Sequence, residues 1–429
     1  MKLDPFMGIE DWDRIGLSVQ ESARRLHRIG YVDRMLMRLE AGHVAARPEY
    51  EVKGALARLC WQDANHSDQL RNRCRQLRMS TKAYDKCPEA ELEALMEAAL
   101  RSPGTLALLK ALFEVIKPAQ VKSIHRYLEA AQPLVDEPTI QMLRGQLHCR
   151  EEQLAWGRLA IEALAEEVSP EEVVEADLWS SYLSVLLAAA GEIDGTSSRI
   201  PVDPGVVRSA PPFELPQHST RDARFRTSVK KFRDIPFSDD DHSRFEMMMY
   251  TRFFEMSPAE GIAHVHFSTL DKPWVFYLDT ARHLWDEVRH AWFGEAALRL
   301  KGYNISDVPN WTGWYDMTAN LFDSDEAYTH LTIAIEKAAM KYPPGKREEW
   351  EFCRDVIKDP HMTTFQDFDW ADEVVHAGFG QRWIIDELYK GDNVKATAAA
   401  DATNMKRAEF MRQFQDESQE PASRYAGGY

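Results

Sequence analysis

The sequence predicts an all-helical protein of two domains. Apolar residues recur at helical spacing along most of the chain, and no stretch alternates with a period of two for long enough to indicate a sheet. A chain of 429 residues is too long for one ordinary core, so two domains are expected. The composition, with 44% hydrophobic and 28% charged residues, is typical of globular proteins.

Residues 1–190 are expected to form the first helical domain. Amphipathic helices follow one another from about residue 17 to residue 187, with apolar residues spaced along one helical face. Prolines end or kink helices, so they mark the expected breaks between these helices. The prolines concerned are Pro48, Pro103, Pro118 and Pro138.

A linker and a second bundle are expected to follow. Six prolines interrupt the polar run 191–237, which therefore predicts a long connection without a helix. Helical periodicity resumes in 238–390, with a charged excursion at 346–359 and a C-terminal tail at 391–429. The four long helices expected in this bundle lie at about 239–269, 273–301, 324–341 and 364–389.

The formal net charge of −17 argues against partners that carry negative charge. Nucleic-acid binding is not expected, because phosphate recognition needs clustered Lys and Arg. The same charge argues against anionic membranes, and no stretch approaches the ~18 apolar residues of a spanning helix. Five cysteines without a Cys-x-x-Cys pair indicate reduced thiols, and the N-terminus lacks an apolar secretion region; both features predict a cytoplasmic protein.

Two segments of the expected second bundle resemble each other closely. Residues 286–294 read Asp-Glu-Val-Arg-His-Ala-Trp-Phe-Gly, and residues 372–380 read Asp-Glu-Val-Val-His-Ala-Gly-Phe-Gly, identical at seven of nine positions. In each, a Glu and a His lie three residues apart and share one helical face. One Glu-x-x-His is weak evidence, but two on facing helices predict a site for two ions of iron, manganese or zinc. The pairs are Glu287 with His290, and Glu373 with His376.

The paired motif resembles the ferritin-like superfamily of dinuclear carboxylate proteins, which includes rubrerythrins, the small subunit of ribonucleotide reductase and bacterial multicomponent monooxygenases. Residues 286–290 are also similar to the Asp-Glu-x-Arg-His form found in the monooxygenases. The resemblance covers about 239–390 and implies a ferritin-like four-helix bundle. In that pattern, helices two and four supply Glu-x-x-His, and helices one and three supply one carboxylate each.

The two single carboxylates have no motif of their own, so we place them by position. Antiparallel helices bring residues level when they lie equally far from the connection. Glu255 lies sixteen residues before the turn at 271–273, and Glu287 lies fourteen after it. Glu260 is the alternative, because it ends a Ser-Pro-Ala-Glu capping box that would break the helix just past Glu255; we favour Glu255. On the third helix, Glu336 lies in an apolar run, where a buried charge needs a cation.

The resemblance also implies partners for the two motif histidines. Each motif Glu follows an Asp, and in the monooxygenase pattern this Asp accepts a hydrogen bond from the histidine of the partner helix, which fixes the histidine tautomer. Asp286 is therefore expected to contact His376, and Asp372 to contact His290. His283 lies one turn before the first motif and could line the site, but a hydrogen-bonded core histidine is the favoured interpretation.

The first domain is a candidate for a decayed copy of the second. Trp61, Asp63 and His66 repeat the spacing of Trp, acid and His in the first motif. A segment resembling the fourth-helix motif has Ala155 where a His is needed, and loss of an imidazole should abolish tight metal binding. This half is therefore interpreted as a scaffold or interaction domain. Glu40, which begins a further Glu-x-x-His, is interpreted as a surface or capping residue.

These observations predict a non-haem dinuclear iron oxidase or oxygenase that activates dioxygen toward a small organic substrate, with manganese or a mixed Mn/Fe pair as an alternative. One rival function is iron oxidation or storage, or peroxide reduction, without an organic substrate. The other is a metal-free helical interaction protein. No catalytic residue outside the metal site is expected, the sequence identifies neither substrate nor electron donor, and a homodimer stays open. The six expected ligands are Glu255, Glu287, His290, Glu336, Glu373 and His376.

Overall fold

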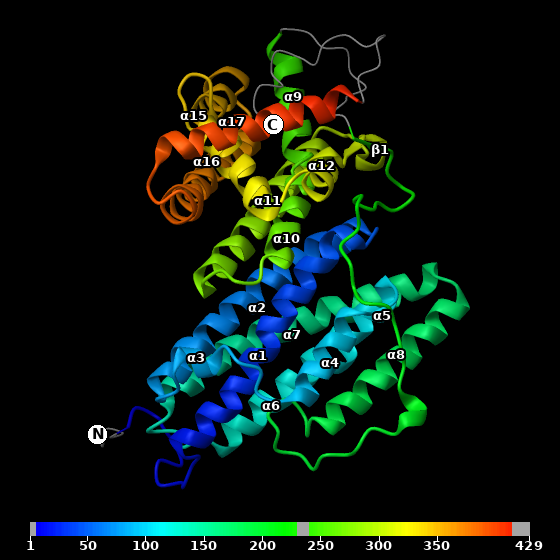
Figure 1. The fold of residues 1–429 in the computed structure, drawn as a ribbon, viewed down its shortest axis with the longest axis vertical. Coiled ribbons are helices and arrows are strands. Elements are labelled where there is room, and N and C mark those ends of the chain that lie inside the picture. Colours follow the sequence, from blue (N-terminus) through cyan, green and yellow to red (C-terminus); the bar gives the residue numbers. More distant parts are fainter. Residues whose placement is uncertain (1–5, 230–239, 414–429) are drawn as a thin grey trace. The chain divides into compact units, whose positions relative to one another are not determined.

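The computed structural model describes residues 6–229 and 240–413 and confirms the all-helical prediction (Figure 1). Within those ranges the strands are β1 (Thr227–Ser228) and β2 (Asn310–Trp311), which pair in parallel over two residues each. Parts of the expected linker and tail, and the start of the expected second bundle, lie outside the described residues. No helix in the described part of the chain has the length and apolar character needed to cross a bilayer.

The chain divides into two compact units, and the second is discontinuous in sequence. The structure thus differs from the expected domains, because the tip of the first helical hairpin belongs to unit 2 and the boundary of unit 1 lies at residue 214 rather than 190. The tip is held there by buried polar contacts, in which Lys53 pairs with Glu260 at 2.9 Å. Unit 1 comprises Met1–Leu39 and Gln62–Glu214, and unit 2 comprises Glu40–Trp61 and Leu215–Tyr429.

Local sequence signals set several helix limits in unit 1. Helix α8 begins with a capping box between Ser169 and Glu172 and has a proline in its first turn. At Pro118 the chain stays helical instead of breaking as expected. The π-helical turn η1 precedes it, so Pro118 lies in the first turn of α6, where its missing N–H costs little. The helices are α1 (Val19–Ala46), α2 (Tyr50–Gln76), α3 (Thr81–Tyr84), α4 (Ala90–Leu100), α5 (Thr105–Lys110), η1 (Ala111–Ile116), α6 (Lys117–Ala130), α7 (Glu137–Glu167) and α8 (Pro170–Ala189), of which α1 and α2 continue into unit 2.

Unit 2 contains the four expected helices, but most of them are interrupted. The first breaks just before Glu255 into two helices, and π-helical turns interrupt the third and extend the fourth. The pieces of these four are α9 (Asp241–Phe253) and α10 (Met256–Ser268), then α11 (Trp274–Leu300), then α13 (Ser324–Thr329), η4 (His330–Glu336) and α14 (Lys337–Ala339), then α16 (Pro360–Phe379) and η6 (Gly380–Leu388).

Several elements of the chain were not expected from the sequence. The expected tail contains α17 (Asn393–Arg412), which packs against η4 and α13. The expected charged excursion at 346–359 forms α15 (Lys346–Glu351) and the π-helical η5 (Phe352–Ile357). The other short elements are η2 (Pro204–Val206), η3 (Ile305–Asp307) and α12 (Gly313–Leu321).

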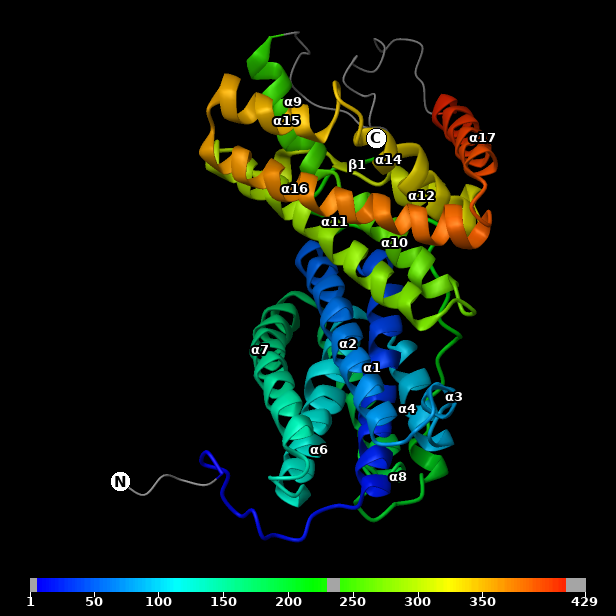
Figure 2. The ribbon, with the colours of Figure 1, turned by 90° about the vertical axis from the view of Figure 1, so that its left-hand side faces the viewer.

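Five packing contacts of unit 2 bring the motif helices together. Helix α11 packs against α9, α10 and α16, and α16 also packs against η4 and α15. In Figure 2 the long α11 and α16 run side by side in this unit. The two Glu-x-x-His motifs therefore lie on neighbouring helices, with η4 and the break between α9 and α10 beside them.

Candidate metal centre

Eight acidic and histidine side chains of unit 2 converge in its interior and form what we call the metal centre. All six expected ligands are among them, and each of the eight is at most 2% exposed. They form two groups, within each of which one potential ligand atom per residue lies within 4.8 Å of the others. Group A is His283, Glu287, Glu336 and His376, and group B is Glu255, His290, Asp369 and Glu373.

Group A is built from two carboxylates and two imidazoles. His283 Nε2 lies 2.7 Å from Glu336 Oε1, and its Nδ1 lies 3.2 Å from the Tyr328 hydroxyl. His376 Nδ1 lies 3.4 Å from Glu287 Oε1 and 3.8 Å from Glu336 Oε1. His283 is thus a buried histidine with hydrogen-bond partners, as favoured, and its ring also faces the same carboxylates as His376, the alternative that the sequence left open.

Group B places one imidazole among three carboxylates. His290 Nδ1 lies 3.4 Å from Asp369 Oδ1 and 3.6 Å from Glu255 Oε2. Glu287 Oε1 of group A is 3.7 Å from the same nitrogen, so this carboxylate lies between the two motif histidines. Asp369 was not expected from the sequence.

The outer nitrogen of each motif histidine contacts an aspartate of the partner helix. His376 Nε2 lies 3.4 Å from Asp286 Oδ2, and His290 Nε2 lies 3.3 Å from Asp372 Oδ2, which are the pairs that the resemblance implies. Burial raises the pKa of Asp286, but His376 and Arg289 outweigh burial and hold it below the usual range. Because the outer Nε2 of each ring faces an aspartate, the Nδ1 of each ring points inward.

The inward-facing atoms fit a metal ion. Among the described residues, His290 Nδ1, His376 Nδ1 and Glu336 Oε2 are buried and make no hydrogen bond. Two ligands of one ion at bond lengths of about 2.1 Å stand roughly 3.0–3.5 Å apart, close to the nitrogen–oxygen separations in both groups. Burial raises the pKa of Glu287 well above its usual range, and the negative charges of Glu255 and Glu373 raise it further. The centre therefore attracts positive charge.

Two cations lie beside group B. Lys346 Nζ is 2.9 Å from Glu373 Oε1 and 3.0 Å from Asp369 Oδ2. Arg252 lies 2.6 Å from Asp369 and 2.7 Å from Glu255. Burial raises the pKa of Glu373, yet the Lys346 ammonium and His376 bring it well below the usual range. The two groups therefore differ in their electrostatic surroundings.

Glu255, rather than its alternative Glu260, lies in the metal centre. Glu260 pairs with Arg221 at 2.6 Å and with Lys53 at 2.9 Å, in a separate buried cluster that anchors the hairpin tip. Glu40 lies on this same tip and is fully buried, so its interpretation as a surface or capping residue is wrong. The reason is that α1 continues to Ala46 and its end packs inside unit 2.

Two glycines of the repeated motif allow the close packing that positions the single carboxylates. A Cβ on Gly294 would lie 2.1 Å from the backbone nitrogen of Phe253, two residues before Glu255. A Cβ on Gly380 would lie 2.9 Å from the side chain of Thr332, four residues before Glu336. Each glycine lies four residues after its motif histidine, so one spacing brings a carboxylate-bearing segment to each motif.

Unit 1 contains a smaller group of the same residue types. Asp33, Asp63 and His66 are buried together. Lys117 Nζ lies 2.7 Å from Asp63 Oδ2, and Arg150 lies 2.8 Å from Asp33 Oδ1. Two cations thus balance two carboxylates, and the charge of this group is compensated by the chain itself.

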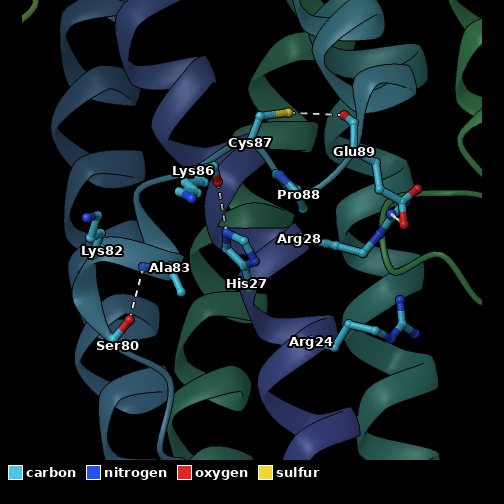
Figure 3. A pocket seen from close by; sticks show the side chains of 10 residues that line it. All are labelled: Arg24, His27, Arg28, Ser80, Lys82, Ala83, Lys86, Cys87, Pro88 and Glu89. Atoms are coloured by element: carbon cyan, nitrogen blue, oxygen red, sulfur yellow. Dashed lines mark hydrogen bonds and ion pairs between the residues drawn. The ribbon is translucent and has the colours of Figure 1, made fainter.

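A surface pocket of about 530 Å³ in unit 1 is lined by several basic side chains (Figure 3). Arg28, which is buried, donates to the backbone oxygens of Ile193 and Ala190 and pairs with Glu89 at 2.6 Å. His27 Nε2 lies 3.0 Å from the backbone oxygen of Tyr84. The buried polar groups of this pocket therefore have partners within the chain, unlike the inward nitrogens of the metal centre.

Comparison with known proteins adds no assignment: no family model, no curated protein and no solved structure matches the chain. The buried groups of unit 2 could hold metal ions, and the geometry leaves the identity of the metal open.

Proposed function

We propose that the protein is a dinuclear metal oxidoreductase of the ferritin-like type, with two ions held in the metal centre of unit 2. One observation carries the proposal. The Nδ1 atoms of His290 and His376 face two different groups of buried carboxylates, while the Nε2 atom of each ring is held by an aspartate. Iron is the proposed metal, and manganese or a mixed pair suits the same oxygen-rich donors.

Group A would hold one ion and group B the other. Glu287 lies 3.4 Å from one motif histidine and 3.7 Å from the other, so it is the residue best positioned to serve both ions. Asp286 and Asp372 would fix the tautomers of the two histidines. When bound, such a pair of ions supplies the redox chemistry by which dioxygen oxidises an organic substrate.

Aromatic side chains next to group A support redox chemistry in a dry interior. The Phe379 ring lies 5.8 Å from that of His283 and 6.1 Å from that of His376, and the Tyr328 ring lies 5.8 Å from that of His283. Both aromatic residues are buried. Exclusion of water strengthens the interaction of the carboxylates with a cation and limits side reactions.

The test follows oxidation and metal retention together. Reduced, iron-loaded protein is mixed with oxygenated buffer in stopped flow, and absorbance, oxygen consumption and iron in solution are recorded. We expect rapid oxidation with about two iron ions kept per chain. Oxygen consumption that rises with an added organic substrate would separate an oxygenase from a ferroxidase.

Other outcomes identify the rival functions. Iron that accumulates far beyond two ions per chain would favour storage. No oxidation above the buffer control, in protein that carries iron, would contradict the redox function. Protein that binds no metal would favour the helical interaction protein. His376→Ala serves as the matched control, because it removes one inward nitrogen and should oxidise far more slowly.

A further inference from the structure

Resting on the dinuclear centre proposed above, we propose that its two metal positions are unequal. The position in group A binds a divalent cation tightly. The position in group B binds more weakly, because Lys346 competes with the second ion for Glu373 and Asp369. Occupancy of the second position, and with it any two-metal chemistry, is then controlled by one lysine side chain.

No described lysine or arginine forms an ion pair with the two carboxylates of group A. The described ion pairs of Glu287 and Glu336 are all with histidines, at distances from 2.7 to 3.8 Å. Imidazoles that bind an ion are neutral and donate electron pairs without cancelling charge, so in the metal-bound state the two carboxylates of this group contribute two negative charges. One divalent ion cancels both, which removes the large penalty of burying uncompensated carboxylates.

Group B is already close to balance. Its three carboxylates meet Lys346 and Arg252, so three negative charges face two positive ones. A divalent ion added there would leave a net positive charge and would stand close to the Lys346 ammonium in a medium of low dielectric. It must therefore displace this lysine from two carboxylates, and the energy of that displacement weakens its binding.

The backbone aims this lysine at the site. Lys346 is the first residue of α15 and is 2% exposed. It follows Gly345, whose φ of 153° favours glycine and whose Cβ would lie 2.1 Å from the backbone oxygen of Lys341. This turn directs the chain back toward α16, which carries Glu373 and Asp369. The lysine therefore reaches the centre from a segment outside the motif helices.

The inference is tested by titrating metal-free protein with Mn²⁺. The electron paramagnetic resonance signal of free Mn²⁺ counts the ions bound, and equilibrium dialysis with elemental analysis checks the count. In the wild type we expect the first ion to bind at least about tenfold more tightly than the second, since one unit charge in a buried site is worth that much or more. Lys346→Met, which keeps the length of the side chain without its charge, should raise the affinity for the second ion at least about tenfold.

A matched control and a second variant keep the test decisive. Lys53→Met removes a lysine that is equally buried and pairs with Glu260 away from the centre, and it should leave both affinities unchanged. If Lys346→Met does not fold, the two phases in the wild type still decide the matter together with His283→Ala. In that variant the tight phase should disappear while the weak phase remains.

The possible failures are distinguishable. If neither the wild type nor Lys346→Met retains any ion, the proposed function itself is wrong. If the wild type binds two ions with equal affinity and Lys346→Met changes neither, the inequality is wrong and the dinuclear centre stands. If His283→Ala removes only the weak phase, the tight position lies in group B and the inference is overturned.

Discussion

The metal centre of unit 2 and the acidic group of unit 1 are both buried, helical and built from carboxylates and histidine, yet they differ in charge balance. In unit 1, Lys117 and Arg150 oppose Asp33 and Asp63, two cations against two acids. In group A of unit 2, the acids meet only imidazoles among the described residues. Residue type and burial are therefore alike in the two places, and only the charge balance differs. We expect the cations of the chain to decide how strongly each buried group attracts an ion.

Removal of a histidine should have opposite outcomes in the two units, and this is the largest expected effect. His376→Ala should release at least one of the two ions, because it deletes an inward nitrogen that faces Glu287. His66→Ala in unit 1 should leave the metal content unchanged. Elemental analysis of both purified variants decides the matter. Full metal content in His376→Ala, or metal loss in His66→Ala, would reverse the comparison.

Removal of Lys117 tests whether the acidic group of unit 1 depends on the cations of the chain. Lys117→Met should lower the free energy of unfolding by about 3–5 kcal/mol, the usual cost of leaving one buried charge without its partner. Lys122→Met is the matched control on the same helix, since Lys122 is 59% exposed and should change stability by less than about 0.5 kcal/mol. Denaturant unfolding measures both. Stabilisation of Lys117→Met, but not of the wild type, by a divalent ion would show that this lysine takes the place of an ion.

A methyl group added to a motif glycine should disturb unit 2 at Gly294 and not at Gly378. Gly294→Ala would force its Cβ against Phe253, so we expect a loss of about 1–3 kcal/mol in stability and weaker metal binding through displaced Glu255. Gly378→Ala, in the second motif, meets nothing within 4 Å. Because alanine is the better helix former, that control should gain about 0.5–1 kcal/mol. Equal effects of the two substitutions would remove the packing role of Gly294.

The aspartates that hold the histidines should act on affinity rather than on the fold. Asp372→Asn should keep the structure and weaken metal binding by about 10- to 100-fold, because the His290 tautomer and its donor strength depend on this contact. Asp325→Asn is the control, since this residue is half exposed and pairs with Lys272. A metal titration measures the affinity, and circular dichroism shows whether the fold is kept. An affinity loss no larger than that of the control would mean that Asp372 does not orient the ligand.

The last effect, confined to acidic pH, concerns a buried histidine of unit 2 whose pKa no carboxylate among the described residues raises. Burial, and then Arg407, lower the pKa of His330 to about 3 from 6.5. Below pH 6.5 the unfolded chain takes up a proton that the folded chain refuses, so stability present above 6.5 is lost as the pH falls toward 3. The loss for one such group is at most about 1.4 kcal/mol per pH unit. Urea unfolding at several pH values should show a shallower dependence in His330→Gln than in the wild type or in the exposed control His148→Gln.

The motif helices were predictable because a period of 3.6 fixes which residues share a face. Glu255 followed from equal distance to a turn, although the helix that carries it breaks at that point. Asp369 was missed and His283 was not counted among the ligands, although each lies four residues before its motif Glu, on the same face. That spacing was the available signal.

Other features depend on tertiary contacts that no local pattern encodes. Lys346 reaches group B only because a turn at Gly345 brings α15 onto α16. Helix α17 was expected to be a tail, since its buried side consists of the small residues Ala396, Ala400 and Thr403, which give little hydrophobic signal. Charge balance likewise appears only when side chains from distant segments are seen together.

The discontinuity of unit 2 has a consequence for synthesis on the ribosome. The hairpin tip, Glu40–Trp61, leaves the exit tunnel long before the rest of its unit, because residues 62–214 must be translated first. Lys53 therefore stays exposed to solvent until its partner Glu260 has been translated. A chain that stops early leaves the apolar side chains of this tip exposed. The order of translation makes completion of unit 2 a late, non-local step, so nascent chains halted before Glu260 should be the ones that chaperones retain.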